Sequence, residues 1–156
     1  MNVKKILVNT IDGKYPILIG KNITPRLEYI LNRNNIFSTK ILLVIDNKVP
    51  SAIIKKIKKS FKKKIFLFYL TSNERNKSQK NVDKIINILL KNKFNRNDCL
   101  ISIGGGIIGD LSAYAASIFK RGLSYVSVPT TLLAQVDSSI GGKTGINSKY
   151  GKNLIG

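Results

Sequence analysis

Histidine is absent from this chain of 156 residues, and cysteine occurs only once. A single cysteine excludes an internal disulfide, which fits a protein of the reducing cytoplasm. Cys99 stands in the apolar stretch 99–101, and no histidine exists that could activate its thiol. We therefore expect Cys99 to be a small buried residue and not a nucleophile.

Long apolar runs are also missing from the sequence. No stretch approaches the roughly 18 apolar residues that a membrane span needs, and residues 1–12 lack the apolar centre of a signal peptide. Hydrophobic residues make up 43% of the chain, whose length is that of one domain with a real core. The sequence therefore predicts one folded, soluble, cytoplasmic domain over residues 1–156, with no membrane partner.

Acidic residues are scarce, because 27 lysines and arginines stand against 8 aspartates and glutamates, a net charge of +19. Such a charge is typical of nucleic-acid-binding proteins. However, 22 of the 27 cations lie in residues 1–99, mostly as lysines between apolar residues at helical spacing, as in 53–61. No aromatic-interleaved basic stripe accompanies them. We interpret the excess as compositional bias on solvent-exposed faces. Nucleic-acid binding is the alternative, and it predicts steep salt dependence.

Short β-rich runs alternate with amphipathic helical stretches along the chain. The predicted strands are 5–9, 15–19, 41–45, 65–70, 99–103 and, as the last, 124–128; the predicted helices are 22–34, a lysine-rich one ending near 61, 78–91 and 107–119. The first two strands flank Asp12-Gly13, a typical hairpin turn. Apolar strands that alternate with helices indicate a parallel sheet covered on both faces. The predicted fold is an open, mostly parallel, Rossmann-like α/β sheet with an N-terminal β-hairpin, and with ligands at the carboxyl ends of its strands.

Three glycines, Gly104, Gly106 and Gly109, follow a predicted strand and open a predicted helix with the spacing G-x-G-x-x-G. Glycine there lets backbone amides approach a pyrophosphate at the positive end of the helix. The motif differs from the common dinucleotide fingerprint because it follows several earlier strands and has no acid about 20 residues later. Asp110 instead follows the last glycine directly. A glycine-rich turn that serves packing alone is the alternative.

Residues beyond 128 form a long stretch rich in glycine and hydroxyl groups, which is typical of functional loops. Thr130 and Thr131 come directly after a predicted strand, where they are placed to bond a ribose or a phosphate. The alternative is that one of them caps a helix that begins at Leu132. Both roles are compatible if one threonine caps and the other faces the ligand.

Charged and amide groups follow in the same stretch. Asp137 can accept hydrogen bonds from sugar-like hydroxyls, and Lys143 can neutralise a phosphate. Gly142-Lys143-Thr144 is similar to a phosphate loop but lacks the first glycine of that motif, so we do not expect nucleoside-triphosphate hydrolysis. Lys152-Asn153 and Arg121 would each be read as solvated surface groups when taken alone. Together with Lys143 they indicate an anion site.

Four motifs appear in a fixed order, namely GGGIIGD at 104–110, KRG at 120–122, VPTTLLAQVDSSIGGKTGIN at 128–147 and GKNLIG at 151–156. Together they resemble the 3-dehydroquinate synthase family. Upstream, YPILIG at 15–20 is similar to the family's N-terminal strand, and LTSNERNKS at 70–78 to its LPDGExxKS loop. Glu74 and Lys77 are kept in that loop, whereas Thr71, Ser72 and Asn73 depart from the family pattern. Among the sugar-phosphate cyclases, DSSIGGKTGIN favours 3-dehydroquinate synthase.

The resemblance implies an activity and two cofactors. The family converts 3-deoxy-D-arabino-heptulosonate 7-phosphate to 3-dehydroquinate and phosphate, on the shikimate route to chorismate, with NAD and a divalent zinc or cobalt ion. By analogy, transient oxidation of a substrate hydroxyl makes phosphate elimination feasible, and the protein supplies positioning and electrostatics. The implied ligands are therefore NAD and a small sugar phosphate.

The resemblance also implies roles for individual residues. The implied NAD contacts are Asp46 and Glu74 on the adenosine side, Lys77, the turn Gly105, Gly106, Ile107, Ile108, Gly109 and Asp110, the hydroxyls of Thr130 and Thr131, and Lys143 and Lys152. The implied catalytic residues are Asp137 on the substrate hydroxyls, Lys143 and Asn153 on its phosphate, Lys152 between cofactor and substrate, and Arg121, which reaches the partner subunit's site in the family's homodimer.

The family's metal ligands match no part of this chain. They are a glutamate and two histidines of a helical C-terminal domain, whereas the chain has no histidine, and its two glutamates, Glu28 and Glu74, lie elsewhere. We therefore expect no metal site in these 156 residues and no turnover by them alone, as in a chain truncated relative to the family. The alternative is a non-catalytic NAD-binding remnant.

Overall fold

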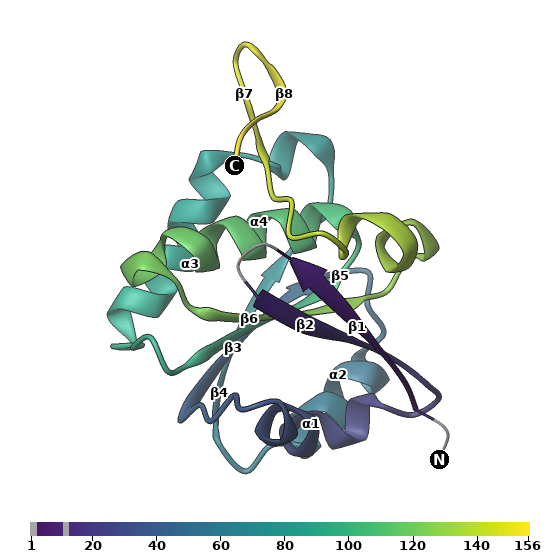
Figure 1. The fold of residues 1–156 in the computed structure, drawn as a ribbon. Helices are drawn as coiled ribbons and strands as arrows, with labels where there is room; N and C mark the ends of the chain where they lie inside the picture. Colours follow the sequence, from purple (N-terminus) through teal and green to yellow (C-terminus); the bar gives the residue numbers. More distant parts are fainter. Residues whose placement is uncertain (1–2, 11–12) are drawn as a thin grey trace.

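The computed structural model describes residues 3–10 and 13–156, and its centre is a sheet of four parallel strands (Figure 1). The strands are β3 (Lys40–Asp46), β4 (Lys64–Leu70), β5 (Cys99–Gly104) and β6 (Ser124–Pro129), in the spatial order β4-β3-β5-β6. Each neighbouring pair is parallel. The predicted open parallel sheet is therefore confirmed, and its four strands stand at the predicted places.

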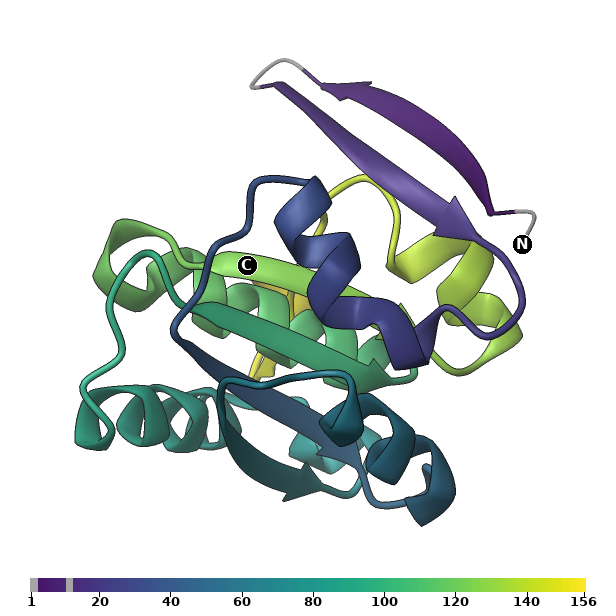
Figure 2. The ribbon, with the colours of Figure 1, turned by 90° about the horizontal axis from the view of Figure 1, so that it is seen from below.

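Helices cover both faces of this sheet (Figure 2). They are α1 (Leu27–Arg33) and α2 (Ser51–Lys59) on one face, and α3 (Gln79–Lys91) and α4 (Gly106–Ile118) on the other. Successive side chains of β3 alternate between two cores: Leu42 and Val44 pack with α3 and α4, while Ile41, Leu43 and Ile45 pack with α1 and α2. Cys99 is fully buried in the second core, where burial raises the pKa of its thiol to about 12, as expected for an inert cysteine.

Short irregular helices connect these elements. They are the 3₁₀ turns η1 (Thr24–Arg26), η2 (Glu74–Asn76) and η3 (Phe119–Arg121), and the π-helix η4 (Ala134–Ser138). The helix predicted at 22–34 thus begins as η1, with Pro25 in its first turn, and becomes α-helical at Leu27. A helix does begin at Leu132, as predicted, and continues into η4.

The N-terminal hairpin forms a separate two-stranded antiparallel sheet of β1 (Lys4–Thr10) and β2 (Gly13–Ile19). The strands confirm the prediction, whereas Asp12 of the predicted turn lies outside the described residues. The Tyr15 hydroxyl accepts a hydrogen bond of 2.8 Å from the Gly141 amide. The hairpin is therefore tied to the glycine-rich stretch beyond 128.

The prediction that 124–128 is the last strand is wrong. A second antiparallel hairpin follows it, made of β7 (Ile146–Ser148) and β8 (Gly151–Ile155), and it projects from the α3 and α4 side of the sheet (Figure 1). These strands are short, polar and largely exposed, so they lack the apolar run or clear alternation that marks a buried strand. Ile146 is the exception, because it is fully buried in the core under α3 and α4.

The strand order places a topological switch point at the carboxyl ends of β3 and β5. From β3 the chain first moves outward to β4, and after α3 it crosses back to β5 and β6 on the other side. In open α/β sheets, ligands bind where the winding direction reverses in this way. Asp46 ends β3 and Gly104 ends β5, and a Cβ at Gly104 would lie 3.1 Å from the Cβ of Asp46. The predicted Asp46 and the glycine turn that begins at Gly104 therefore lie at the carboxyl edge of the sheet, where ligands are expected.

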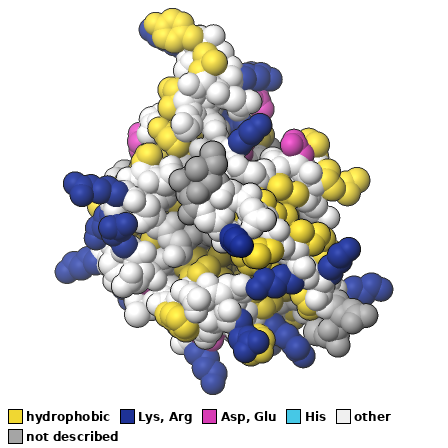
Figure 3. All heavy atoms as spheres, viewed as in Figure 1, with side chains coloured by type: hydrophobic (Ala, Val, Ile, Leu, Met, Phe, Trp, Pro, Cys, Tyr) yellow, Lys and Arg dark blue, Asp and Glu magenta, His cyan; other side chains and the backbone are white. Residues whose placement is uncertain are grey.

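Lysine and arginine side chains are dispersed over the face shown in Figure 3, rather than gathered in one stripe. This distribution agrees with the interpretation of the net charge as a property of many solvent-exposed positions. No helix within the described ranges is both long enough and apolar enough to cross a lipid bilayer.

Asp98 is fully buried and fastens the loop before β5 to the start of β3. Its Oδ1 accepts hydrogen bonds from the Thr39 amide (3.2 Å), the Thr39 hydroxyl (2.8 Å) and the Lys40 amide (2.8 Å). Its Oδ2 accepts one from the Asn95 amide at 2.9 Å. Burial opposes ionisation, but these hydrogen bonds outweigh it, so that the pKa of Asp98 is lowered.

We expect Asp98→Asn to lower the free energy of unfolding by about 2 kcal/mol at pH 7, because a carboxamide cannot accept on both sides. With a lowered folded-state pKa, the carboxylate's contribution is complete above the unfolded pKa of about 3.9 and is lost as the pH falls through the folded pKa. The penalty should therefore shrink in acid. Urea unfolding between pH 7 and pH 3 measures it, with the exposed Asp83→Asn as a control that changes stability by less than about 0.5 kcal/mol. A penalty independent of pH would contradict this account.

Candidate functional site

The glycine turn between β5 and α4 forms an uncapped helix N-terminus. Gly105 is the N-cap residue of α4, and no side chain among the described residues caps it. The Gly109 amide is the first to bond back into the helix, to the Gly105 carbonyl at 3.1 Å, which leaves the amides of Gly106, Ile107 and Ile108 for an external acceptor. Three amides without a partner in the helix, at the positive end of 13 helical residues, are groups that can bind an anion.

Space at this turn depends on glycine. A Cβ at Gly105 would lie 3.2 Å from the Thr131 side chain, and a Cβ at Gly106 would lie 2.9 Å from the Ser138 hydroxyl. The backbone is thus held between residues of the 130–138 segment, where a larger residue would crowd the approach to the amides. The packing alternative explains Gly104, whose Cβ would clash with Ile108, but it does not explain the open amides. The open amides are compatible with the predicted pyrophosphate site, which stays a prediction.

The two threonines after β6 have different roles. The Thr131 hydroxyl accepts a hydrogen bond of 3.2 Å from the Ala134 amide, so Thr131 caps the following helix. The Thr130 amide donates to the Gly104 carbonyl at 2.9 Å, which fixes the start of the 130–138 segment against the glycine turn. The exposed Thr130 side chain is therefore available to a ligand at the switch point.

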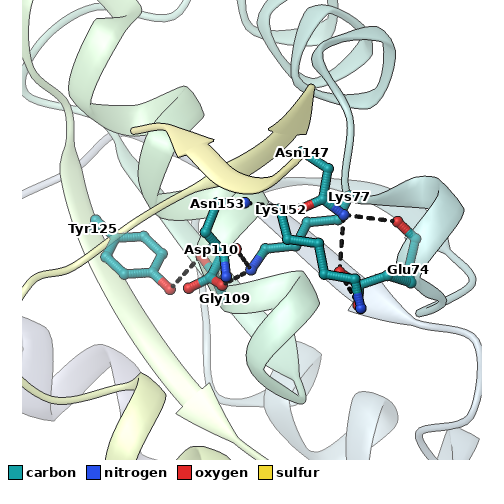
Figure 4. A network of polar contacts seen from close by, with 8 residues as sticks. All are labelled: Glu74, Lys77, Gly109, Asp110, Tyr125, Asn147, Lys152 and Asn153. Carbon is teal, nitrogen blue, oxygen red and sulfur yellow. Dashed lines mark hydrogen bonds and ion pairs between the residues drawn. The ribbon is translucent and has the colours of Figure 1, made fainter. Parts of the chain in front are cut away.

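Lys77 joins three segments of the chain in one polar network (Figure 4). Its Nζ lies 2.5 Å from Asp110 Oδ2 and donates a hydrogen bond of 2.5 Å to Asn153 Oδ1. The Lys77 residue is only 7% exposed, which is rare for lysine and is made possible by these two partners. Lys77 thereby connects the turn after β4 with the first turn of α4 and with β8.

Asp110 is a largely buried carboxylate paired with Lys77. Its pKa is raised, mainly by burial; the hydrogen bond and the charge of Lys77 lower it, and the charges of Asp137 and Glu74 raise it further. The effect of Asp137 shows that η4 brings this carboxylate close to α4. A carboxylate whose charge depends on one lysine is sensitive to any further charge placed beside it.

Glu74 faces β7 and β8 from the turn η2. Its Oε1 accepts a hydrogen bond of 2.8 Å from Asn147 Nδ2, and it lies 3.9 Å from Lys152 Nζ. The pKa of Glu74 is lowered, chiefly by the hydrogen bond from Asn147; desolvation opposes this effect, and the charges of Lys152 and Lys77 add to it. The predicted residues Glu74, Lys152 and Asn153 are thus brought together, although Lys152 is mostly exposed.

A cavity of about 240 Å³ lies beside α4, and both Lys143 and Asp110 line it. Its lining combines small residues of α4, Tyr125 of β6 and hydroxyls of the 138–144 segment; the described lining residues are Gly109, Asp110, Ala113, Ala116, Ser117, Leu123, Tyr125, Ser138, Ser139, Gly142, Lys143 and Thr144. The Tyr125 hydroxyl donates to the Gly109 carbonyl at 3.2 Å and bonds Ser102 at 2.7 Å (Figure 4 shows the first contact). A lysine, hydroxyls and a glycine backbone suit a phosphorylated ligand.

Two predicted residues lie apart from this network. Asp46 ends β3 beside Gly104, is only 5% exposed, and accepts a hydrogen bond of 3.1 Å from the Lys48 amide. Arg121 lies at the opposite edge of the sheet, because α4 carries the chain back to the start of β6. Its φ is 64° and that of Lys120 is 47°, so two non-glycine residues take the left-handed conformation there. Arg121 therefore lies apart from the network around Lys77, at the other end of α4.

Sequence reasoning assigned no role to Asn147, Ser138 or Tyr125. All three hold the predicted residues in place, since Asn147 bonds Glu74, Ser138 packs on Gly106, and Tyr125 bonds the Gly109 carbonyl. Asn147 and Ser138 lie inside the motif 128–147, which was the available signal. Tyr125 had no signal, because an aromatic residue in a strand is ordinary.

Comparison with known proteins decides the family. A family model described as 3-dehydroquinate synthase N-terminal matches residues 67–156, more than half of the chain. The chain belongs to the 3-dehydroquinate synthase family. Its full length is 55% identical to 3-dehydroquinate synthase of Pelagibacter ubique (strain HTCC1062), of which it covers 43%, and 40% identical to that of Sulfurimonas denitrificans, of which it covers 42%. The chain thus spans less than half the length of these relatives.

Solved structures related to the 3-dehydroquinate synthase family share the fold. A 2-deoxy-scyllo-inosose synthase complexed with carbaglucose-6-phosphate, NAD⁺ and Co²⁺ matches 98% of this chain with a TM-score of 0.89 at 24% identity, over 42% of its own length. A 2-epi-5-epi-valiolone synthase from Streptomyces hygroscopicus, with NAD⁺ and Zn²⁺ bound, matches 76% of this chain with a TM-score of 0.70 at 28% identity, over 34% of its own length. The architecture described above is therefore that of the sugar-phosphate cyclases.

Metal-ligating side chains are dispersed over the part of the chain that the structure describes. Within 3–10 and 13–156, no three histidine, cysteine, aspartate or glutamate side chains gather in a group that could hold a metal ion. The only cysteine is buried, and Asp110 is engaged with Lys77. The donor set on this side of the site suits an anionic cofactor and not a divalent cation.

Proposed function

We propose that this chain binds NAD at the switch point and forms the cofactor-binding part of a 3-dehydroquinate synthase. That enzyme converts 3-deoxy-D-arabino-heptulosonate 7-phosphate to 3-dehydroquinate and phosphate. The observation that carries the proposal is the uncapped glycine turn of α4, which stands beside the Lys77, Asp110 and Asn153 network at the carboxyl edge of the sheet. Family membership supplies the reaction class.

The chain's own residues divide the work of holding NAD. The amides of Gly106, Ile107 and Ile108 bind the pyrophosphate, and Thr130 contacts the cofactor from the facing segment. Asp46 accepts hydrogen bonds from the adenosine ribose, as an acid at the end of a neighbouring strand does in dinucleotide sites. NAD bound there would supply a hydride acceptor for the oxidation of a substrate hydroxyl. Asp110 and Lys77 fix the first turn of α4 and thereby orient the cofactor.

The cavity beside α4 supports a sugar-phosphate substrate. Lys143 provides a cation for the phosphate, and Asp137 provides acceptors for substrate hydroxyls from η4. The contacts of Asn153 with Lys77 and of Lys152 with Glu74 support a place for these two β8 residues in the same site. The proposed contribution to catalysis is positioning and electrostatic stabilisation of an anionic substrate.

The proposal includes two statements about assembly. The metal-dependent part of the reaction uses ligands outside these 156 residues, so they bind NAD but do not turn over alone. Arg121, at the far edge of the sheet, serves the site of a second copy in a homodimer. Its left-handed backbone, followed by Gly122 at φ 120°, directs the chain sharply away from α4 and suits a residue that points outward.

Calorimetry with NAD and NADP on the 156-residue chain tests the cofactor site. We expect NAD to bind and NADP to bind at least about tenfold more weakly, because a 2′-phosphate would meet the Asp46 carboxylate. Asp46→Asn should narrow this difference, and the exposed Lys80→Ala should leave it unchanged. A folded chain without NAD affinity at millimolar concentration would overturn the proposal, as would DNA binding that NAD does not displace.

A chimera distinguishes an enzyme part from a non-catalytic remnant. The chain replaces the matching 43% of the Pelagibacter ubique relative, to which it is 55% identical, and is fused to the rest of that protein. We expect phosphate release that requires the chimera, NAD and zinc or cobalt, and that Lys143→Ala removes. NAD binding without phosphate release by a folded chimera would identify the remnant.

A further inference from the structure

Asn147 uses its backbone and side chain to bond two segments that are distant in sequence. Its amide donates to the Lys77 carbonyl at 2.8 Å, and its Nδ2 donates to Glu74 Oε1 at 2.8 Å and to the Glu74 carbonyl at 3.3 Å. Its Oδ1 accepts a hydrogen bond of 3.0 Å from the Asn153 amide. The side chain therefore donates on one side to the η2 turn and accepts on the other from β8.

This arrangement requires an amide side chain. Glu74 offers only acceptors, and the Asn153 amide offers only a donor, so the residue between them must provide both. Aspartate could accept from Asn153 but would place a carboxylate against that of Glu74. Alanine could provide neither contact.

Asn153, which donates its amide to Asn147, has a left-handed backbone conformation. Asn153 has a φ of 56°, in the left-handed region that asparagine tolerates better than most residues. In this conformation its amide faces Asn147 Oδ1 while its own Oδ1 accepts from Lys77 Nζ. The chain of contacts therefore runs from Glu74 through Asn147 and Asn153 to Lys77 and Asp110, as Figure 4 shows.

We infer that Asn147 is a positioning residue that sets Glu74 and the Lys77–Asn153 pair in one arrangement for cofactor binding. It acts through these residues and does not contact the pyrophosphate turn itself. The inference deepens the proposed function and rests on it, because the ligand that benefits is NAD. The structural part of the inference, that Asn147 couples Glu74 to β8, can be tested without any ligand.

The first arm of the test is NAD affinity. Asn147→Asp should raise the Kd for NAD about tenfold, because the Glu74 contact is replaced by repulsion. The matched control is Asn87→Asp on the exposed face of α3, which makes the same change in charge and should leave the Kd unchanged. In a Glu74→Gln background, where the repulsion is absent, Asn147→Asp should have a clearly smaller effect. Equal effects in both backgrounds would overturn the inference.

The second arm is a titration of Glu74, whose pKa would not change if Asn147 served only to fill space. The chain has only two glutamates, Glu28 and Glu74, so carbon-13 labelling of glutamate gives two carboxyl signals. The charged groups that face Glu74 are Lys77, Lys152 and Asp110, and Asn147→Ala leaves all three in place. We expect the pKa of Glu74 to rise in this variant, and the second carboxyl signal serves as an internal reference.

The two arms separate the possible failures. If the native chain does not bind NAD, the proposed function fails, whereas the Glu74 titration still tests the coupling. If NAD binds but neither the Kd nor the Glu74 titration responds to Asn147, the positioning role is wrong. Asn147→Ser, which keeps one hydroxyl donor for Glu74, should give an intermediate Glu74 pKa if the larger changes prevent folding, and an unchanged one would contradict the role.

Discussion

Replacement of Lys77 by methionine is expected to lower the free energy of unfolding by about 3 kcal/mol at pH 7 and to weaken NAD binding more than about tenfold. Methionine keeps most of the buried side-chain volume but leaves the Asp110 carboxylate, whose side chain is only 16% exposed, without its ion-pair partner. Asn153 Oδ1 loses the same donor. The turn after β4, the first turn of α4 and β8 are then no longer joined.

The loss in the Lys77→Met variant should depend on pH in a defined direction. The pKa of Asp110 is already raised, chiefly by burial, and removing the Lys77 bond and charge raises it further. A carboxyl group with a raised folded-state pKa binds more protons in the folded than in the unfolded chain, so stability increases as the pH falls through that pKa. The penalty should therefore be smaller at pH 5 than at pH 7.

Urea unfolding of the native chain and of Lys77→Met at the two pH values measures this difference. The control is Lys80→Met, a neighbouring exposed lysine, which should cost less than about 0.5 kcal/mol. Each penalty is the difference in unfolding free energy between variant and native chain at the same pH, so the contribution of Asp98 to acid sensitivity cancels. A Lys77→Met penalty as small as that of Lys80→Met would falsify the view that the buried pair organises the site.

Gly104→Ala is expected to cost about 3 kcal/mol of unfolding free energy and to reduce NAD affinity more than about tenfold. A Cβ at this position would lie 2.9 Å from Ile108 Cβ and 3.1 Å from Asp46 Cβ. Both contacts involve atoms attached directly to the backbone, so side-chain rotation cannot relieve them. The first turn of α4 must move away from β3, which separates the pyrophosphate amides from Asp46.

Gly109→Ala is the matched substitution for stability, because it lies in the same helix-opening motif. A Cβ there would meet only the Tyr125 hydroxyl at 3.7 Å, an ordinary contact. Alanine in a helix interior should stabilise the chain by about 0.5 kcal/mol. Thermal unfolding of both variants checks the opposite signs, and calorimetry with NAD checks the effect of Gly104→Ala on the site. Two similar unfolding temperatures would contradict the packing argument.

The sheet was predictable from the sequence because its strands are buried on both faces. Residues 41–45 and 99–103 are apolar without interruption, and helices of clear amphipathic period separate them. The glycine turn was predictable for a similar reason, since glycine spacing between a strand and a helix has a direct backbone meaning. The sequence left open which threonine, Thr130 or Thr131, caps the next helix, and the structure shows that Thr131 does so.

The internal contacts of the site could not be predicted in the same way. Lys77 and Asn153 are 76 residues apart, and a pairing at that distance leaves no periodicity in the sequence. Hairpin β7–β8 was missed because short polar strands have neither an apolar run nor a regular alternation. The placement of Arg121 at the opposite edge follows only once the length of α4 is known. The resemblance to the family implied roles for these residues, but it did not show which other residues of the chain they contact.

The ties between η2 and β7–β8 also set an order of events during synthesis. All four strands of the parallel sheet lie before residue 130, whereas Asn147 and Asn153 are made later. A chain emerging from the ribosome can therefore close most of its core while Glu74 and Lys77 still lack their partners. On the proposed function, NAD affinity depends on the docking of β7–β8 against η2, after the parallel sheet has formed. A nascent chain that has its sheet but lacks β7–β8 would then bind NAD more weakly than one in which this hairpin has docked.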